Sequence, residues 1–208
     1  MAWIHVEGMN VHHAVFGEIT YDEDELSWVG RCRLPAFAAW SMQPNGALEQ
    51  PGEDQRAGFF PLTIYDATGV GPSVQQGNTY RFVQQNEQDT CEAVLLALLD
   101  CYRSFYGSNW DWAKQRRDSR IWGWLARRLL QDAYEVPDDL KPVVRCTAME
   151  LSYLHVGAYA YAAFRFDTAD GLDSEHGIAV VFQPDKGASW GDASAIHHVE
   201  AADNVDAE

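Results

Sequence analysis

The chain has 208 residues, of which 47% are hydrophobic and 12% aromatic, which is enough apolar material to bury a substantial core. Fifteen Lys and Arg against 31 Asp and Glu give a formal charge of −16, which disfavours nucleic acid and anionic lipid and favours cationic partners or plain solubility. There is neither a run of roughly 20 apolar residues nor a signal-peptide pattern, so we expect a cytoplasmic protein with no membrane contact.

The first third of the chain has the pattern of β-structure. An extended run over 11–21 is followed by residues 26–34, in which apolar and polar side chains alternate. Such runs around a polar turn predict a hairpin with one solvent-facing side. The turn itself is formed by four acidic residues, Asp22, Glu23, Asp24 and Glu25. Prolines and glycines within 41–55 then predict a long loop, and 59–66 is a further strand candidate.

The middle of the chain changes from strand to helix patterns. Residues 69–73 are glycine-rich, but they lack the lysine of a phosphate loop and Pro72 removes a backbone donor. We therefore expect a turn there and not a phosphate-binding loop. We expect a short strand over 78–83. Apolar residues at helical spacing then predict a helix over 87–106 and a second helix over 119–134.

The last third returns to strands, predicted over 147–156, 159–166 and 177–182. Strands, then helices, then strands predict an α+β fold, with a mostly antiparallel sheet and helices packed on one side. We expect a single domain over 1–198, with a helical elaboration at about 107–141. The acidic, alanine-rich stretch 199–208 lacks periodicity and is expected to be a disordered tail.

Candidate catalytic or metal-binding residues are sparse. Glu175 and His176 are adjacent, so on a strand they would point to opposite faces, and no HxxxH or HExxH motif completes a ligand set. The pairs His12–His13 and His197–His198 also lack ligand spacing. Four cysteines without CxxC spacing are expected to be reduced thiols. We therefore expect no metal and no cofactor, and keep a metal-assisted hydrolase using His176 and Glu175 as an alternative.

The segment 110–128 concentrates aromatic and basic side chains, with four of the eight tryptophans and six of the 15 Lys and Arg. Two interpretations stay open: the tryptophans pack on the sheet while the arginines face water, or both serve as anchors for a partner protein. Base stacking is a third use of such residues, but the net charge disfavours nucleic acid. The candidate partner-binding residues here are Trp110, Trp112, Arg116, Arg117, Trp122 and Trp124.

Three stretches together resemble a known family. They are residues 16–22 with 28–30, the Gly-Pro-Ser turn and following residues at 71–76, and the Glu-His-Gly element at 175–180 followed by 190–193. The chain resembles a family of uncharacterised bacterial domains often encoded beside polymorphic or contact-dependent toxins. The family's basic residue and further histidine after Glu-His-Gly are replaced here by residues 183–186, so the resemblance implies no catalytic or metal-binding residue.

The resemblance implies an immunity protein, which binds a cognate toxin domain and neutralises it by occlusion. The negative charge suits a cationic toxin, because opposite potentials speed encounter. On this hypothesis the acidic turn 22–25 joins the aromatic and basic residues as a partner-binding candidate. The metal-assisted hydrolase and an adaptor subunit of a larger complex are the alternatives.

Overall fold

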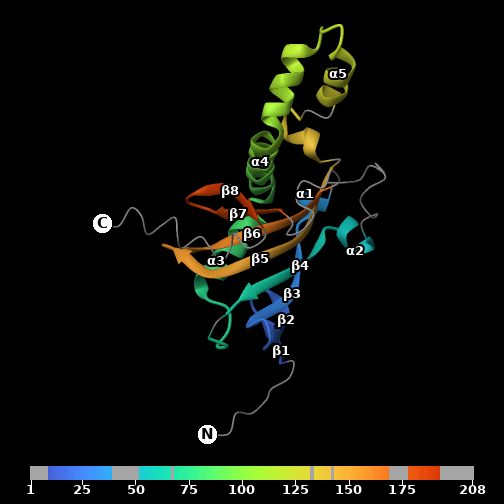
Figure 1. The fold of residues 1–208 in the computed structure, drawn as a ribbon. Helices are drawn as coiled ribbons and strands as arrows, with labels where there is room; N and C mark the ends of the chain where they lie inside the picture. The colour runs from blue at the N-terminus through green and yellow to red at the C-terminus, as the bar shows by residue number, and fades with distance from the viewer. Residues whose placement is uncertain are drawn as a thin grey trace, which may run out of the picture.

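An eight-stranded sheet with helices packed against it forms the body of the protein (Figure 1). The computed structural model describes residues 9–38, 52–66, 68–131, 134–141, 143–168 and 178–192. The strands are β1 (Asn10–His13), β2 (Gly17–Asp22), β3 (Ser27–Arg33), β4 (Phe59–Tyr65), β5 (Val144–Val156), β6 (Tyr159–Thr168), β7 (Ile178–Gln183) and β8 (Gly187–Asp192). The helices are α1 (Pro35–Ala38), α2 (Glu53–Arg56), α3 (Val74–Gln85), α4 (Glu87–Arg116), α5 (Gly123–Gln131) and the 3₁₀ helix η1 (Pro137–Leu140).

The strands lie in the sheet in their chain order, from β1 at one edge to β8 at the other. Every neighbouring pair is antiparallel except β4 and β5, where Leu62 pairs with Met149 in a parallel register. A parallel pair needs a crossover connection, and α3, α4, α5 and η1 supply it. The predicted α+β fold with a mostly antiparallel sheet is therefore confirmed.

The main core lies between the sheet and helices α1, α3 and α4. Alternate strand residues face these helices, as strand geometry requires, and Phe164 of β6 stacks on Phe37 of α1 with ring centroids 4.8 Å apart. Leu98 and Tyr102 bury one side of α4 in the same core. All four cysteines are free thiols in the protein interior. No helix among the described residues is long and apolar enough to cross a membrane.

The prediction of a strand over 78–83 is wrong, because these residues lie inside helix α3. Ser73 begins the helix: its hydroxyl accepts a hydrogen bond from the backbone of Gln76, whose side chain in turn accepts one from the backbone of Ser73. This reciprocal capping box outweighs the strand preference of the Thr, Tyr, Phe and Val that follow.

Several predicted boundaries also change. Helix α4 begins at Glu87 as expected but ends at Arg116, ten residues after the predicted end, and α5 is shorter than the predicted 119–134. Part of the predicted loop 41–55 forms the short helix α2. The predicted extended run 11–21 is divided by a turn at 14–16 into β1 and β2, which pair as a hairpin. Strand β8, which pairs with β7, was not predicted. The expected tail 199–208 lies outside the described residues.

Candidate functional site: a projecting helical arm

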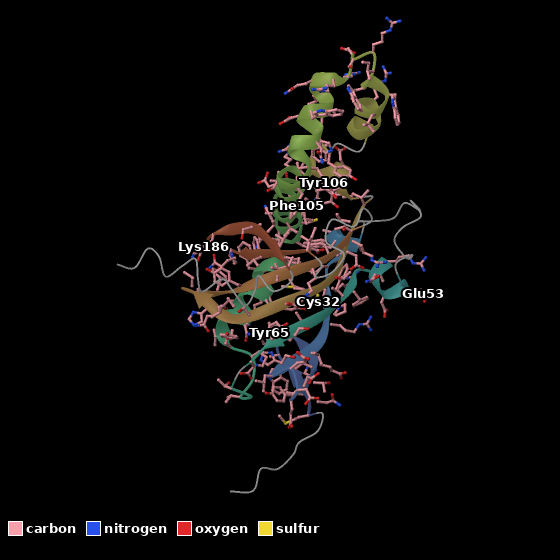
Figure 2. All side chains as sticks on the ribbon, in the orientation of Figure 1. Cys32, Glu53, Tyr65, Phe105, Tyr106 and Lys186 are labelled. Atoms are coloured by element: carbon pink, nitrogen blue, oxygen red, sulfur yellow. The ribbon has the colours of Figure 1, made fainter. Side chains whose placement is uncertain are left out.

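Helix α4 runs past the edge of the sheet and continues as a projection that we call the arm, residues 106–131 (Figure 1). Phe105 contacts Trp190 of β8 with ring centroids 5.7 Å apart, and Figure 2 shows Phe105 and Tyr106 where the helix passes the sheet. Beyond this point α5 packs back against α4. The arm is thus a pair of helices joined by the turn 117–122.

The base of the arm is held by aromatic packing. Trp110 is only 8% exposed, and its ring lies 6.0 Å from those of both Tyr106 and Tyr134. The guanidinium of Arg103 donates a 2.9 Å hydrogen bond to the carbonyl of Glu135. A groove of about 590 Å³ lies beside these residues. The structure therefore places Trp110 inside the base of the arm, where it holds the segment after α5 against α4.

The tip of the arm exposes large apolar side chains. Ile121 is 75% exposed, Trp122 45% and Trp124 64%. Trp122 packs edge-on against the half-buried Trp112 at 6.2 Å between ring centroids, and the guanidinium carbon of Arg116 lies 5.3 Å from the centroid of the Trp112 ring. This cation–π contact fixes the Arg116 side chain over an indole face. The structure thus brings Trp112, Arg116 and Trp122 together, with Trp124 nearby on α5.

A tight turn makes this arrangement possible. The backbone of Gly123 donates a 2.9 Å hydrogen bond to the carbonyl of Ser119, and the Ser119 hydroxyl accepts one from the backbone of Trp122. A Cβ at position 123 would lie 2.9 Å from the carbonyl oxygen of Arg117. Because that contact is with backbone, only glycine lets α5 start this close to the end of α4.

The arm tip, which we define as residues 114–128, is strongly basic. It holds six Lys or Arg and one Asp, a net charge of +5, so the remaining residues carry −21. Arg116, Arg117, Arg120 and Arg127 are exposed. The ion pairs found within the described residues all lie elsewhere. The tip is therefore a cationic and aromatic surface on an otherwise acidic protein.

The acidic turn 22–25 does not join this surface. It connects β2 and β3, whereas α4 packs on β7 and β8 at the far end of the sheet (Figure 1). Asp22 also has a local role, because its carboxylate accepts hydrogen bonds from the backbones of Asp24 and Glu25 over 3.1 and 3.2 Å. Side-chain acceptors of this kind stabilise tight turns. The two groups of candidate residues lie at opposite ends of the sheet.

A partly buried ion pair lies on the other face of the sheet. Glu150 of β5 accepts two hydrogen bonds from the guanidinium of Arg165 on β6, one of them from Nη2 over 3.2 Å. Burial favours the neutral form of Arg165, but Glu150 outweighs burial and raises the pKa of the guanidinium. Burial and Glu150 also raise the pKa of the neighbouring Tyr65. Each charge compensates the other, so loss of either partner would leave an unpaired charge in the centre of the sheet.

The histidine candidates are only partly described. Glu175, His176, His197 and His198 lie outside the described residues. His13 has a structural role, since its Nδ1 accepts a 3.1 Å hydrogen bond from the backbone of Val15. Within the described ranges, no three His, Cys, Asp or Glu side chains gather as a metal site would require.

Comparison of the chain with models of known protein families, with curated proteins and with solved structures gives no match. The fold and the arm are therefore what characterises the molecule. It is an α+β protein whose acidic body carries a basic, aromatic projection.

The composition of the sequence was sufficient to mark the segment 110–128 as a candidate site. The exposure of Ile121 and the need for Gly123 were missed, because both depend on how α5 folds back on α4.

Proposed function

We propose that this protein is an immunity-type inhibitor that binds a toxin domain through the arm and neutralises it by occlusion. The observation that carries the proposal is the exposure of Ile121, Trp122 and Trp124 on a projecting arm. Large apolar side chains clustered in water on a projection favour burial against another protein, and Trp and Arg are the residues most enriched among binding hot spots.

The size of the exposed surface supports a stable complex. Full burial of a large apolar side chain contributes about 1.5–3 kcal/mol, and each 1.4 kcal/mol or so changes affinity about tenfold. Three such side chains, held by a packed turn, are thus sufficient to dominate the binding energy of a small interface. The Trp112–Trp122 contact fixes part of this surface before binding, which lowers the entropy cost of association.

The charge distribution supports a toxin with a cationic surface. The residues outside the arm tip carry a net charge of −21, and such a field speeds the approach of a cationic domain. Occlusion needs only tight binding over the toxin's working surface and requires no catalytic group in this chain. The exposed apolar and basic side chains of the arm are therefore sufficient for the proposed role.

Co-expression tests the proposal. The product of the gene next to this one is expressed in a bacterial host with and without this protein, and host survival and co-purification are scored. We expect the neighbour to be toxic, survival to be restored, and both chains to elute as one complex. A harmless neighbour, or rescue without a complex, would overturn the proposal.

A variant pair tests the arm. Trp122→Ala with Trp124→Ala should weaken the complex by 100-fold or more, since hot-spot truncations cost roughly 2–4 kcal/mol each. Leu96→Ala is the matched control, because Leu96 is a half-exposed apolar residue of α4 that lies before the arm. An equal effect of both changes would show that the arm is not the anchor. Circular dichroism confirms that each variant is folded.

A further inference from the structure

We infer that the arm tip enters an acidic recess of the toxin, a carboxylate-lined cleft within an otherwise cationic domain. This inference rests on the proposed function and specifies the partner's chemistry. It adds an acidic recess to the cationic partner that the sequence predicts. The reason is that the surface best suited to binding, residues 114–128, has a charge of +5.

The two opposite charges of the protein act at different places. Helix α4 continues for eleven residues after Phe105, its contact with β8, which corresponds to about 16 Å of helix. The Debye length at physiological salt is about 8 Å, so the field of the acidic body is largely screened at the tip. A partner therefore meets a positive tip and a negative body as separate surfaces, and complementarity requires a negative recess within positive surroundings.

The arginines at the tip are suited to carboxylates. Arg116, Arg117 and Arg120 are exposed, and the ion pairs of the described residues involve none of them. A guanidinium binds a carboxylate through two parallel hydrogen bonds, and Arg116 is already oriented by the Trp112 ring. The exposed Ile121 and Trp124 would pack against the walls of the recess and exclude water, which strengthens such charge-assisted bonds.

This charge pattern has a functional meaning. A nuclease that uses divalent metal ions combines a cationic surface for phosphates with a carboxylate cluster that holds the metal. A cationic arm that enters such a cluster would occupy the place of the metal, while the acidic body would lie over the phosphate-binding surface. A metal-dependent nuclease is therefore the class of toxin that this charge pattern fits.

Charge reversal in the co-expressed complex tests the inference. Arg116→Glu with Arg117→Glu should weaken binding about 100-fold, whereas Arg56→Glu with Arg81→Glu, on the exposed faces of α2 and α3, should change it less than about threefold. Arg116→Lys with Arg117→Lys keeps the charge but loses the planar fork, and should give an intermediate loss. These conservative substitutions keep the test informative if the Glu variants fail to fold.

Competition by metal supplies a second readout. At matched ionic strength, MgCl₂ should dissociate the complex more than NaCl, because Mg²⁺ competes with guanidinium groups for the same carboxylates. A complex that loses affinity with the Trp variants, but not with the Arg variants or MgCl₂, would overturn the acidic recess and leave the proposed function standing. Absence of any complex would overturn both. Binding of a DNA or RNA oligonucleotide through Arg116 and Arg117 would overturn the recess in favour of nucleic acid.

Discussion

The indole Nε1 of Trp28 donates a 3.1 Å hydrogen bond to Oδ2 of Asp66, and this contact joins strand β3 to the turn that follows β4. The same carboxylate accepts hydrogen bonds from the backbones of Thr68, over 2.9 Å, and Gly71, over 2.7 Å. Asp66 therefore fixes the turn that positions Ser73, the N-cap of α3. Burial alone would raise the pKa of Asp66, but these hydrogen bonds, together with one from the Thr68 hydroxyl, outweigh burial and hold the pKa below its ordinary value.

The first prediction concerns Asp66→Asn and its dependence on pH. Because the pKa of Asp66 is lower in the folded than in the unfolded state, the ionised carboxylate stabilises the fold above about pH 4. That contribution is lost as the pH falls through the folded-state pKa. We expect Asp66→Asn to lower the free energy of unfolding by about 2 kcal/mol near neutral pH, and the difference from the wild type to shrink below about pH 4.

Urea denaturation at a series of pH values measures this difference. Asp24→Asn is the control, because Asp24 is an exposed residue of the β2–β3 turn, and its replacement should change the free energy of unfolding by less than about 0.5 kcal/mol. A difference between Asp66→Asn and the wild type that stays constant with pH would contradict the role assigned to the ionised carboxylate.

The second prediction concerns Gln76, whose buried side-chain amide is hydrogen-bonded to both β4 and β5 at the point where the two strands stop pairing. Its Nε2 donates hydrogen bonds to the carbonyls of Tyr65, over 2.8 Å, and Ser152, over 3.0 Å. Gln76→Leu would leave both carbonyls without this donor and would remove the acceptor for the Ser73 backbone, so we expect a loss of about 1–3 kcal/mol in the free energy of unfolding. Gln85→Ala, at an exposed position of the same helix, should have little effect in the same chemical denaturation experiment. Equal effects would contradict the role of the buried amide.

Helix α3 also shows what could and could not be predicted from the sequence. Long periodic or alternating segments were predictable, because hydrophobic burial imposes a period of two on strands and 3.6 on helices. Residues 78–83 were misassigned because their β-branched and aromatic side chains favour strands, while the helix signal lay in Ser73 and Gln76. The spacing of three residues between Ser73 and Gln76, which is typical of a capping box, is visible in the sequence.

The candidate site was predictable in composition but not in geometry. The density of Trp and Arg marked the segment 110–128, yet exposure separates its members, since Trp110 is buried at the base and Trp124 is exposed at the tip. This difference in exposure arises because α5 packs back against α4, and no local sequence pattern predicts that packing. The distance between the arm and Asp22 could not be predicted either, because it follows from the order of the strands in the sheet.

The third prediction concerns the thiols. All four cysteines are buried, and burial raises the pKa of Cys32 to about 12 and that of Cys146 well above its ordinary value. Because the thiolate is the reactive form, we expect Ellman's reagent to label none of them in the folded protein and all four after denaturation. Ser104→Cys, at an exposed position of α4, should add one thiol that reacts at once. Rapid labelling of the wild type would contradict the packing of the core.

The fourth prediction compares two glycines of the arm. A Cβ at Gly123 would meet the carbonyl oxygen of Arg117 at 2.9 Å, so Gly123→Ala must shift α5 away from α4. A Cβ at Gly107, within α4, meets no atom within 4 Å. We therefore expect Gly123→Ala to destabilise the arm by about 1–3 kcal/mol, and Gly107→Ala to stabilise it by about 0.5–1 kcal/mol, because alanine is the better helix former.

Hydrogen exchange of amides within 106–131 measures these changes in the arm itself, since α5 can open without unfolding the sheet. Faster exchange in Gly123→Ala, together with slower exchange in Gly107→Ala, would confirm that the close turn holds the two helices together.

The same two glycine variants also test whether binding to the toxin depends on the turn. If the Trp and Arg side chains act only when the turn presents them, Gly123→Ala should weaken the toxin complex although no side chain of the binding surface is altered, whereas Gly107→Ala should leave it intact. Unchanged binding by Gly123→Ala would show that the surface does not depend on the turn.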